Sequence, residues 1–540
     1  MNASNYINTQ LQDSLIVSRE MLDGCCPEII DCIDCAIADL QAPIQLAIIG
    51  KISSSKSTLV NAILGASNIV ATGQAELTYN VNWLKYGSLD DDIVVYFKDG
   101  THEAKPRTEW TLLANRLSDE EATENDELKQ YVDKIKYIEV PYPAEILKYV
   151  NIIDTPGLYS YYRKDSENTL SFLKEVKPDA VVMLFVKSIL SEDMETLSKF
   201  QEKAAGRQQM FTLSPLNAIG MLAKMDESWK VTEQKNPYDV SSRVIEDLKR
   251  DHLELTTTFF DIQPVSALLG LSTVFVEADF PQLKKLAALS DDQLVNFFKS
   301  KRHFLAATEA VGLSQETLKL LLLHYGLYGM YAIIRFIKLK PDGSVAELSM
   351  YIEEISGFKK FRSLLFAHFR DRAVLIKAQN SVQAIIDRCE AVRKVTHDEQ
   401  VKERINQVQV KIMTSFMSVH EYAEWFYLLK IYNGEFNHLE KNMTDEYKII
   451  CGENGNSVVS KLSLAPNSTV KDMQAKSAER ASYWNRQYNV ARIRKPKDAE
   501  LCKVMAESYK VLGKRIDEMA QLEREAREII NKAHAFFYGE

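Results

Sequence analysis

The sequence predicts an α/β domain, with a mostly parallel sheet and flanking helices, joined to an elongated antiparallel α-helical bundle. Short apolar runs without polar alternation recur from Ile44 to about Ala267, which is typical of strands buried on both faces. After about Ser272 these runs disappear and long helical patterns dominate. We therefore expect N-terminal helices that join the bundle, an α/β domain, and a helical neck and stalk, over residues 1–41, 42–300 and 301–540.

Six apolar runs carry the strand prediction. They are QLAIIG, VVYFKDG, VNIIDTPG, AVVMLFV, AIGMLAKMD and FFDIQPVSA. In the second half of the chain, apolar residues step by three or four from Ile405 to Phe426 and from Leu501 to Ala533, so each stretch predicts a long helix. Residues 451–470 are rich in Gly, Asn, Ser and Pro, and they predict a loop at the tip of the bundle.

The composition indicates a soluble globular protein: 46% of the 540 residues are hydrophobic and 26% are charged. A net charge of −9 argues against a surface built for nucleic acid. Seven cysteines and the absence of a signal-peptide pattern favour the reducing cytoplasm. The apolar run Leu320–Ile334 lies between Lys319 and Arg335 and is too short to span a bilayer. We expect a buried helix there, with a membrane-inserting segment as the alternative.

The stretch IQLAIIGKISSSKSTLVNAILG, Ile44 to Gly65, has the form of a phosphate-binding loop between a strand and a helix. In such a loop, backbone N–H groups surround the phosphates, a lysine neutralises their charge and the next hydroxyl binds Mg²⁺. Gly50, Lys56 and Ser57 fit these roles, but Ser55 stands where the second glycine is expected. The nucleotide-binding residues expected here are Gly50, Ser54, Ser55, Lys56, Ser57 and Thr58.

Two later strand ends supply the complementary groups. In VNIIDTPG, Asp154 can hold Mg²⁺ and the Gly157 N–H can meet a γ-phosphate. In AIGMLAKMD, the Asp226 carboxylate can accept two hydrogen bonds from guanine, which adenine cannot donate, while the stem of Lys224 covers the ring. This element selects GTP over ATP, although Ala223 replaces the usual Asn or Thr.

The base contacts would be completed by Ser266 and Ala267, which follow FFDIQPV. Each motif alone is weak, because each also occurs in ordinary turns and surfaces. Together, in this order and each at a strand end, they predict an α/β P-loop GTPase domain.

On these motifs the chain resembles the bacterial dynamin-like proteins of the dynamin superfamily. GKISSSKSTLVNAILG is similar to their phosphate loop, ATGQAELTYNVNWLKYG to their first switch, and PDAVVMLFVKSILSEDMETLSKF to a strand and the helix after it. HYGLYGMYAIIRF and SGFKKFRSLLFAHFRDRAVLIKAQ also look like segments of this group. The type associated with labile enterotoxin output is the nearest by size.

The resemblance implies roles for individual residues. Thr78 would be the switch threonine that binds Mg²⁺ and positions water, and Ser53 would help hold a charge-compensating monovalent cation. The implied catalytic residues are Ser53, Lys56, Thr78 and Gly157, and the implied Mg²⁺ ligands are Ser57, Thr78 and Asp154. Ile52 stands where animal dynamins have a glutamine, so it lowers the expected hydrolysis rate.

Ser55 is the greater departure from the family pattern. If its position requires a positive φ, a serine costs roughly 1 kcal/mol, and its side chain crowds the phosphates. We therefore expect weak nucleotide binding. The resulting hypothesis is a slow dynamin-like GTPase that uses GTP, GDP and Mg²⁺ and couples nucleotide state to stalk movement, self-assembly or membrane remodelling. The alternative is a scaffold with a degenerate site, favoured by Ser55, Ile52 and Ala223.

Residues 471–498 form a basic segment in an acidic protein, with eight basic and three acidic residues. It is either a solvated helix face or a surface for anionic lipid, with Tyr483, Trp484 and Tyr488 at headgroup level. Expected partners are a second copy of the chain, through the GTPase domain and the stalk, with anionic lipid and related dynamin-like proteins left open. We expect no nucleic acid partner, and a cytoplasmic or peripheral membrane location.

Overall fold

The computed structural model describes the chain apart from residues 1–2, 52, 68, 71–77, 116–125, 158–171, 174–175, 177, 190–192, 195–212, 234, 253, 371, 454–456 and 539–540. It contains two compact units. Unit 1 consists of residues 1–42 together with 374–540, and unit 2 is Pro43–Ala373. The first unit is therefore built from both ends of the sequence. The domain boundaries expected from the sequence stay predictions.

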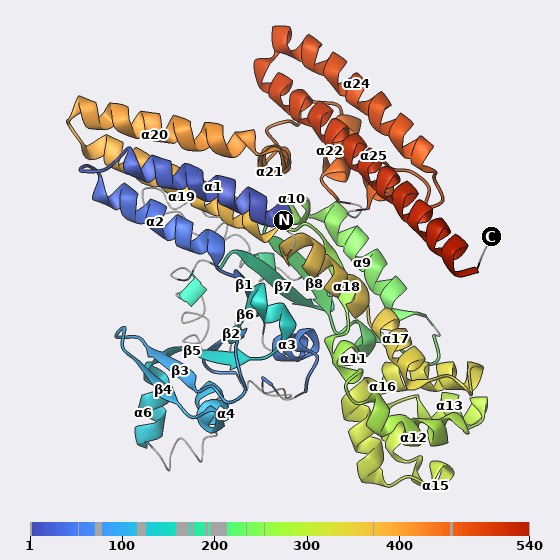
Figure 1. The fold of residues 1–540 in the computed structure, drawn as a ribbon. Helices are drawn as coiled ribbons and strands as arrows, with labels where there is room; N and C mark the ends of the chain where they lie inside the picture. The colour runs from blue at the N-terminus through green and yellow to red at the C-terminus, as the bar shows by residue number, and fades with distance from the viewer. Residues whose placement is uncertain are drawn as a thin grey trace. The chain divides into compact units, whose positions relative to one another are not determined.

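Unit 2 contains a mixed sheet that has nine strands within the described residues, in the order β4-β3-β5-β2-β6-β1-β7-β8-β9 (Figure 1). Its five strands from β6 to β9 in that order run parallel, and β2 pairs antiparallel with β6. The strands are β1 (Ile44–Gly50), β2 (Val81–Tyr86), β3 (Ile93–Phe97), β4 (His102–Lys105), β5 (Ile135–Tyr142), β6 (Val150–Asp154), β7 (Ala180–Val186), β8 (Ala218–Ala223) and β9 (Ile262–Val265).

The six apolar runs all form strands, as predicted, namely β1, β3, β6, β7, β8 and β9. Strands β6, β8 and β9 are buried at every position, which explains their continuous apolar sequence. The strands β2, β4 and β5 are not among the predicted strands. The strand β4, with the sequence HEAK, lies at the edge of the sheet and has no buried residue, so no apolar signal marks it.

Helices cover the sheet and extend unit 2 beyond the expected α/β domain. They are α3 (Lys56–Leu64), α4 (Trp110–Ala114), α6 (Asp126–Lys134), α9 (Pro237–Asp251), α10 (Glu254–Thr258), α11 (Ala267–Ser272), α12 (Val276–Ala287), α13 (Asp291–Phe297), α14 (Lys301–Leu305), α15 (Thr308–Val311), α16 (Gln315–Leu339), α17 (Val345–Ile355) and α18 (Phe358–Leu365). Short 3₁₀ segments are η1 (Arg107–Glu109), η2 (Glu145–Lys148) and η3 (Met225–Ser228), and η4 (Phe366–Arg370) is a π-helical turn.

Helix α16 contains the apolar run noted in the sequence, and it is longer than that run. In the described part of the chain it is the one helix that is long and apolar enough, by length and composition, to cross a membrane. The run Leu320–Ile334 by itself was too short for this to be expected. Half of its most apolar window is buried. Its inward residues, among them Leu318, Tyr325 and Ile333, belong to one apolar core with α12 and α17. This burial agrees with the expected core helix.

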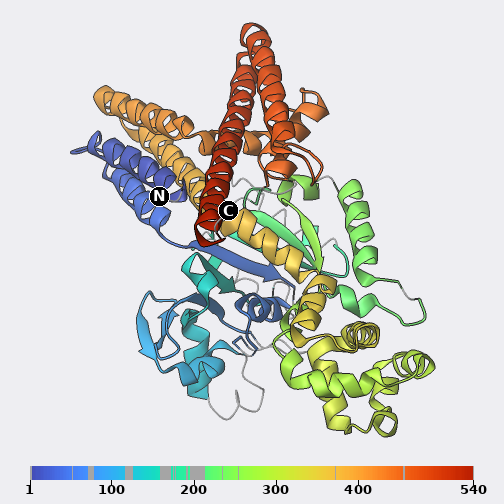
Figure 2. The same ribbon diagram turned by 45° about the vertical axis from the view of Figure 1, so that its right-hand side comes forward.

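The described residues of unit 1 that form regular structure are all helical (Figure 2). Its helices are α1 (Ala3–Glu20), α2 (Pro27–Gln41), α19 (Ala373–Val395), α20 (Glu399–Ser418), α21 (His420–Tyr432), α22 (Lys441–Ile450), α23 (Val458–Lys461), α24 (Val470–Arg494) and α25 (Pro496–Tyr538). One apolar core joins α1, α2, α19 and α20, so the N-terminal helices complete the bundle as predicted.

Two of the helix predictions need correction. The stripe from Ile405 to Phe426 is divided between α20 and α21, because Val419 takes an extended backbone (φ −81°, ψ 112°) while its side chain stays buried. The stretch 451–470 does not join two long helices, since α22 has only 10 residues and α23 lies within the stretch. The stripe from Leu501 to Ala533 does form one helix, α25.

The basic segment lies on α24, which pairs with α25 as a helical hairpin around Lys495 (Figure 2). Trp484 is fully buried, and its indole N–H donates to Glu446 of α22 at 3.0 Å. Arg480 forms an ion pair with the same carboxylate, to which the Tyr509 hydroxyl also donates at 2.7 Å. The expectation that Trp484 faces a membrane is therefore wrong, since the indole packs inside the hairpin and hydrogen-bonds there.

Candidate functional site

The expected phosphate loop connects the end of β1 to the start of α3. Gly50 is required by a close approach of backbone, because a Cβ there would lie 2.8 Å from Ser54 Oγ and 2.9 Å from the Leu184 carbonyl oxygen of β7. Lys56 is buried, and its ammonium donates to the carbonyls of Gly50 and Lys51 at 3.1 and 3.0 Å. The loop therefore curls around its own lysine.

Ser55 departs from the phosphate-loop motif, but it has the backbone conformation that the second glycine of the motif would have. Ser55 is left-handed (φ 71°, ψ 28°) and directly precedes α3, and Ser53 also has a positive φ of 56°. A left-handed backbone costs a non-glycine residue roughly 1–2 kcal/mol. The strain is therefore present in the folded chain. The expectation that Ser55 weakens nucleotide binding stays a prediction.

Three side chains from separate segments meet beside the loop. The hydroxyl of Ser57 donates to Asp154 Oδ2 at 3.1 Å and lies 3.2 Å from Thr78 Oγ1. Asp154 ends β6, which pairs with β1, and Thr78 is fixed by a β-bridge to Asn115. The structure thus brings together all three residues expected as Mg²⁺ ligands. Hard oxygen ligands of this kind suit Mg²⁺.

Asp154 is a buried carboxylate whose partners do not satisfy it. Burial raises its pKa to about 6, although the Lys56 ammonium and the Ser57 hydrogen bond both lower it. Within the described residues, no group hydrogen-bonds to Asp154 Oδ1 or to the buried Ser54 Oγ. Buried polar atoms without partners are uncommon and need an explanation. A bound cation and its phosphate would supply the missing contacts, so the donor set fits Mg²⁺.

The turn after β6 is tied to β1 by a contact that the sequence analysis missed. Thr155 is buried, and its hydroxyl donates to the Ile48 carbonyl of β1 at 2.8 Å. Gly157, expected at the γ-phosphate, is also buried at the end of this turn. Ile52 lies outside the described residues, as does the segment just before Thr78.

A second group of expected residues lies at the ends of β8 and β9. Asp226 and Ser266 are hydrogen-bonded through their side chains, and burial raises the pKa of Asp226 although this hydrogen bond opposes the shift. Lys224 has a left-handed backbone (φ 59°) and pairs with Glu227 at 3.3 Å. Ala223 is buried in β8. Asp226 is half-buried, and its carboxylate has two oxygens that can accept hydrogen bonds.

The remaining expected residues connect these two groups. Ala267 begins α11, which packs on α3, the helix that carries Ser57 and Thr58. The parallel strands β1, β6, β8 and β9 all place their carboxyl ends at the same edge of the sheet. The phosphate loop, the carboxylate of Asp154 and the residues around Asp226 therefore all lie at this edge of the sheet.

Gly326 was missed as a site residue. It interrupts α16 with a backbone (φ 63°, ψ 178°) that is open essentially to glycine alone. A Cβ there would lie 3.5 Å from Leu268 Cδ2 and 3.6 Å from Asp226 Oδ2. The break therefore lets α16 pass against the residues around Asp226. The sequence does contain a sign of this break, because a glycine inside an apolar helical run often marks a place where two segments pack closely.

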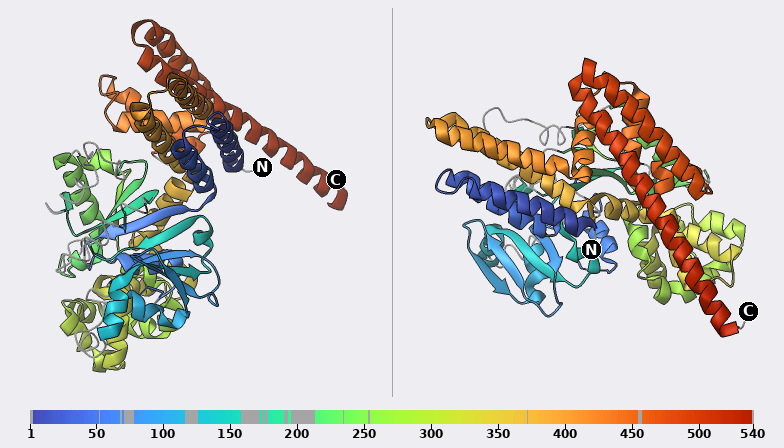
Figure 3. Two further views of the ribbon diagram at one scale, coloured as in Figure 1. Left: turned by 90° about the vertical axis from the view of Figure 1, so that its left-hand side faces the viewer. Right: turned by 45° about the horizontal axis from the view of Figure 1, so that its top comes forward.

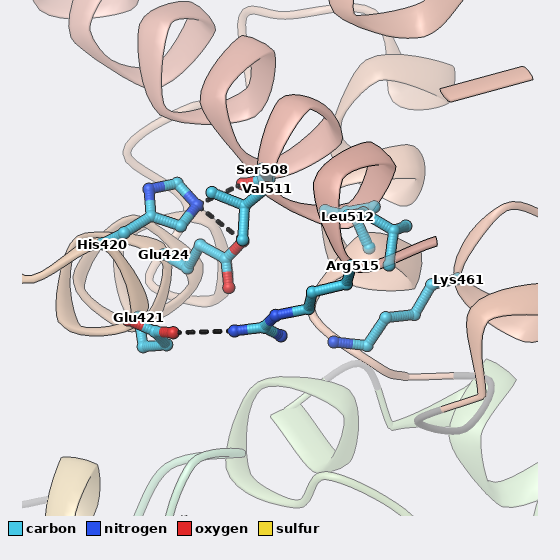
Figure 4. Close-up of a pocket in the computed structure, with 9 residues that line it drawn as sticks. His420, Glu421, Glu424, Lys461, Ser508, Val511, Leu512 and Arg515 are labelled. Atoms are coloured by element: carbon cyan, nitrogen blue, oxygen red, sulfur yellow. Dashed lines mark hydrogen bonds and ion pairs between the residues drawn. The ribbon is translucent and has the colours of Figure 1, made fainter. Parts of the chain in front are cut away.

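A separate cavity of about 30 Å³ lies in unit 1, between α21 and α25 (Figure 4). His420 Nε2 lies 3.1 Å from both Glu424 Oε1 and Ser508 Oγ. In a catalytic triad the two partners would use different ring nitrogens, so this cluster does not form one. Burial lowers the pKa of His420, but the hydrogen bond to Glu424 and the charges of Glu424, Glu421 and Glu507 together raise it overall. Arg515 pairs with Glu421 at 3.0 Å, and we assign the cluster a structural role.

Comparison with known proteins places the site in a family context. Residues 46–214 match the model of the dynamin family. The isoniazid-induced protein IniC of Mycobacterium tuberculosis is 24% identical over 355 residues, which are 64% of this chain and 67% of that protein. Dynamin-like protein 2 of Campylobacter jejuni is 28% identical over 141 residues, 26% of this chain and 20% of that protein.

Among solved structures, the chain is similar to one described as an oligomerised bacterial dynamin pair that provides a mechanism for the long-range sensing and tethering of membranes. The identity is 15%, the match covers 97% of this chain and 79% of that chain, and the TM-score is 0.34.

Replacing Ser55 separates the effect of its left-handed backbone from the effect of its side chain. We expect Ser55→Gly to change GTP affinity by less than about threefold, because the left-handed strain is already present in the folded protein and its relief does not depend on ligand. Ser55→Ala keeps the Cβ without the hydroxyl and is the matched control. Calorimetric titration with GTP and GDP measures the affinities. Tightening of about tenfold by the glycine alone would show that the strained loop forms only with nucleotide.

Replacing Gly326 tests the break in α16. We expect Gly326→Ala to lower the free energy of unfolding by about 1–3 kcal/mol, since alanine does not tolerate this backbone. We also expect weaker guanine nucleotide binding, because relief of the strain would shift the backbone of α16 that passes beside Asp226. Urea unfolding and GDP titration give both readouts. Leu323→Ala, at a position of α16 that is 70% exposed, should change neither. An unchanged unfolding midpoint for Gly326→Ala would contradict the strain argument.

Proposed function

We propose that this chain, whose residues 46–214 match the dynamin family, is a slow, Mg²⁺-dependent dynamin-like GTPase whose nucleotide state controls the helices of its stalk. The observation that carries the proposal is the convergence of Ser57, Thr78 and Asp154 beside the phosphate loop. These residues are separate in sequence, and no structural need in the described protein accounts for the buried, unpartnered oxygen of Asp154.

The phosphate end of the site would work mainly through charge and position. Lys56 would exchange its two carbonyl partners for phosphate oxygens, and the backbone at Gly50, Ser54, Ser55 and Thr58 would surround them. Mg²⁺ would supply Lewis-acid stabilisation of the phosphate charge, held by Ser57, Thr78 and Asp154. Gly157 would direct its N–H to the γ-phosphate. Ser53 would help hold a monovalent cation.

The base end would select guanine. Asp226 is held in place by Ser266, so its carboxylate is oriented before the base arrives. Guanine N1–H and its exocyclic amine are two donors that this carboxylate can accept together, whereas adenine leaves it unpaired and buried. Lys224 and Ala267 would cover the ring. GTP and GDP are therefore the proposed ligands.

We propose slow hydrolysis for two reasons. Ile52 has no group that could orient the attacking water, which the resemblance assigns to a glutamine in animal dynamins. Ala223 has no side-chain amide or hydroxyl to brace the loop that carries Asp226. Neither substitution removes a group that binds phosphate or metal, so nucleotide binding should persist when catalysis is weak.

Nucleotide state would act through the segments that meet the γ-phosphate, at Thr78 and Gly157. Segments of this kind order on the third phosphate and relax after hydrolysis. We propose self-association through the GTPase domain and the stalk as the readout, in the cytoplasm or at a membrane surface. Support for a membrane role is limited to the basic residues of α24 that remain exposed, including Lys471, Arg486 and Arg492, and to what is described for the bacterial dynamin pair.

The second candidate is a scaffold with a degenerate site that binds nucleotide without hydrolysing it, or does not bind it. Ser55, Ile52 and Ala223 favour it. Two observations argue against the scaffold. The Lys56 ammonium is hydrogen-bonded within the phosphate loop, and the side-chain oxygens of Ser57, Thr78 and Asp154 lie together. A site that had lost its function would have no reason to keep either arrangement. Phosphate release from GTP under single-turnover conditions, with and without Mg²⁺, distinguishes the two candidates.

The base assignment can be tested with one substitution. We expect Asp226→Asn to weaken GTP binding about tenfold or more and to improve binding of XTP, because the amide donates where the carboxylate accepts. Titration with GTP, XTP and ATP is the measurement. Lys56→Ala should abolish binding of all three, and Asp239→Asn, an exposed position on α9, should preserve the wild-type order. Unchanged GTP affinity in Asp226→Asn would remove Asp226 from the site.

The switch assignment predicts a difference between the diphosphate and the triphosphate. Thr78→Ala should leave GDP affinity within about twofold and remove most of the hydrolysis, since its metal contact matters when the third phosphate is present. Thr108→Ala, an exposed threonine of the same domain, is the matched control. GDP titration and single-turnover GTP hydrolysis give the two values. Equal loss of GDP and GTP affinity would contradict the role of Thr78 as a switch residue.

A further inference from the structure

The last third of α25 exposes an apolar stripe that is buried along the rest of the helix. Leu501, Met505, Leu512 and Ile516 are almost completely buried within unit 1. The stripe then continues in sequence, but Met519, Leu522, Ile529 and Ile530 are exposed by 66, 59, 67 and 63%. All residues from 521 to 532 are exposed. Apolar residues in such a continuous row indicate a contact surface.

The helix α24 packs beside the apolar stripe of α25 only as far as the first residue of α24. Ser477 near the start of α24 donates to the Tyr509 carbonyl at 2.6 Å, and Gln474 bonds to Asp517. At this spacing the first residue of α24, Val470, lies beside about residue 520 of α25. The helix α25 then continues to Tyr538 (Figure 3). We call residues 519–536 the α25 extension.

The extension has the residue spacing of a coiled coil. Met519, Leu522, Ala526 and Ile529 step by three and four, and Ala533 and Phe536 continue the same steps in the sequence. This is a heptad pattern, with 519, 526 and 533 at position a and 522, 529 and 536 at position d. The preceding stripe, in contrast, has the looser spacing of a packed globular helix.

We propose that the α25 extension pairs antiparallel with the same segment of a second copy of the chain. In one register, Ala526 of each helix would lie against Ile529 of the second copy, a layer formed twice by the two-fold symmetry. This layer matches a small side chain with a large one, which lets the helices approach closely. The surface is thus complementary to itself.

The charges beside the stripe select this register. In it, Glu525 of each helix faces Lys532 of its partner copy, which gives two attractive pairs, and Glu523 faces Ile530. A shift of the antiparallel register by one heptad would bring Glu525 against Glu525 and Glu523 against Glu523. A parallel pair would bring Glu518 against Glu523. Like charges at these positions disfavour both alternatives.

The same charges disfavour a lipid surface as the occupant. Between Met519 and Lys532, three acidic residues (Glu523, Glu525 and Glu528) balance three basic ones (Arg524, Arg527 and Lys532). A helix that lies on an anionic membrane carries a basic excess on its polar face. A contact of about 26 Å with fewer than three heptads is short, so the pairing is expected to be weak and concentration-dependent.

The inference specifies the self-association of the proposed function and rests on it. The test is sedimentation of the full-length protein over a range of concentrations without nucleotide, where the switch segments supply no γ-phosphate contacts. Wild-type protein should dimerise. Glu525→Lys and Lys532→Glu should each weaken the dimer about tenfold, because each turns two attractive pairs into two repulsive ones. The double variant should recover wild-type association within about threefold.

Arg524→Glu reverses a charge at an outward position of the same helix and is the matched control, so it should leave the dimer unchanged. GDP titration of each variant reports the nucleotide site separately, so loss of nucleotide binding and loss of pairing are distinguishable. A monomer at every concentration would overturn the proposal, as would a double variant no better than the singles. Vesicle binding that rises in Glu525→Lys and falls in Lys532→Glu would assign the surface to lipid instead.

Discussion

The parallel pairing of β1 with β6 on one side and β7 on the other is the constraint on which the site depends. It fixes the height of Gly50 relative to Asp154, with Ile48 beside Asp154 and Gly50 beside Leu184. Because β7 lies so close, only glycine fits at the end of β1, and the chain must turn at once into the loop. The hydrogen bond of Thr155 to β1 then holds the turn that follows β6. The position of each residue of the site depends on the register of these strands.

The elements that the sequence predicted are those whose environment is uniform. A strand buried on both faces has one kind of neighbour, so β1, β6, β7, β8 and β9 read directly as apolar runs. Among the strands that were not predicted, β4 lies at the edge of the sheet without a buried residue, and β2 and β5 are only partly buried. The expected site residues follow the strand ends, and the side chains of Ser57, Thr78 and Asp154 do lie together. Their chemical roles stay predictions.

Other features depend on contacts between distant segments, which local patterns do not encode. The burial of Trp484 requires the carboxylate of Glu446, 38 residues earlier, so its surroundings in the sequence pointed to a membrane instead. The division between α20 and α21 at Val419 leaves the apolar spacing unbroken. The sequence alone left open whether Ser55 has a left-handed backbone, and the structure shows that it does.

The carboxylate of Glu446 has a mechanical consequence. It accepts hydrogen bonds from Arg480 and Trp484 of α24 and from Tyr509 of α25, so a single side chain of α22 fastens both arms of the helical hairpin. Neither arm can slide past the other without breaking several of these bonds together. The hairpin is therefore fastened to α22 at one point, near Tyr509, while Gln474 and Asp517 hold its two arms together farther along. From about residue 520 to Tyr538 the helix α25 runs about 27 Å beyond the start of α24, so a tilt of about 10° there would displace its far end by roughly 5 Å.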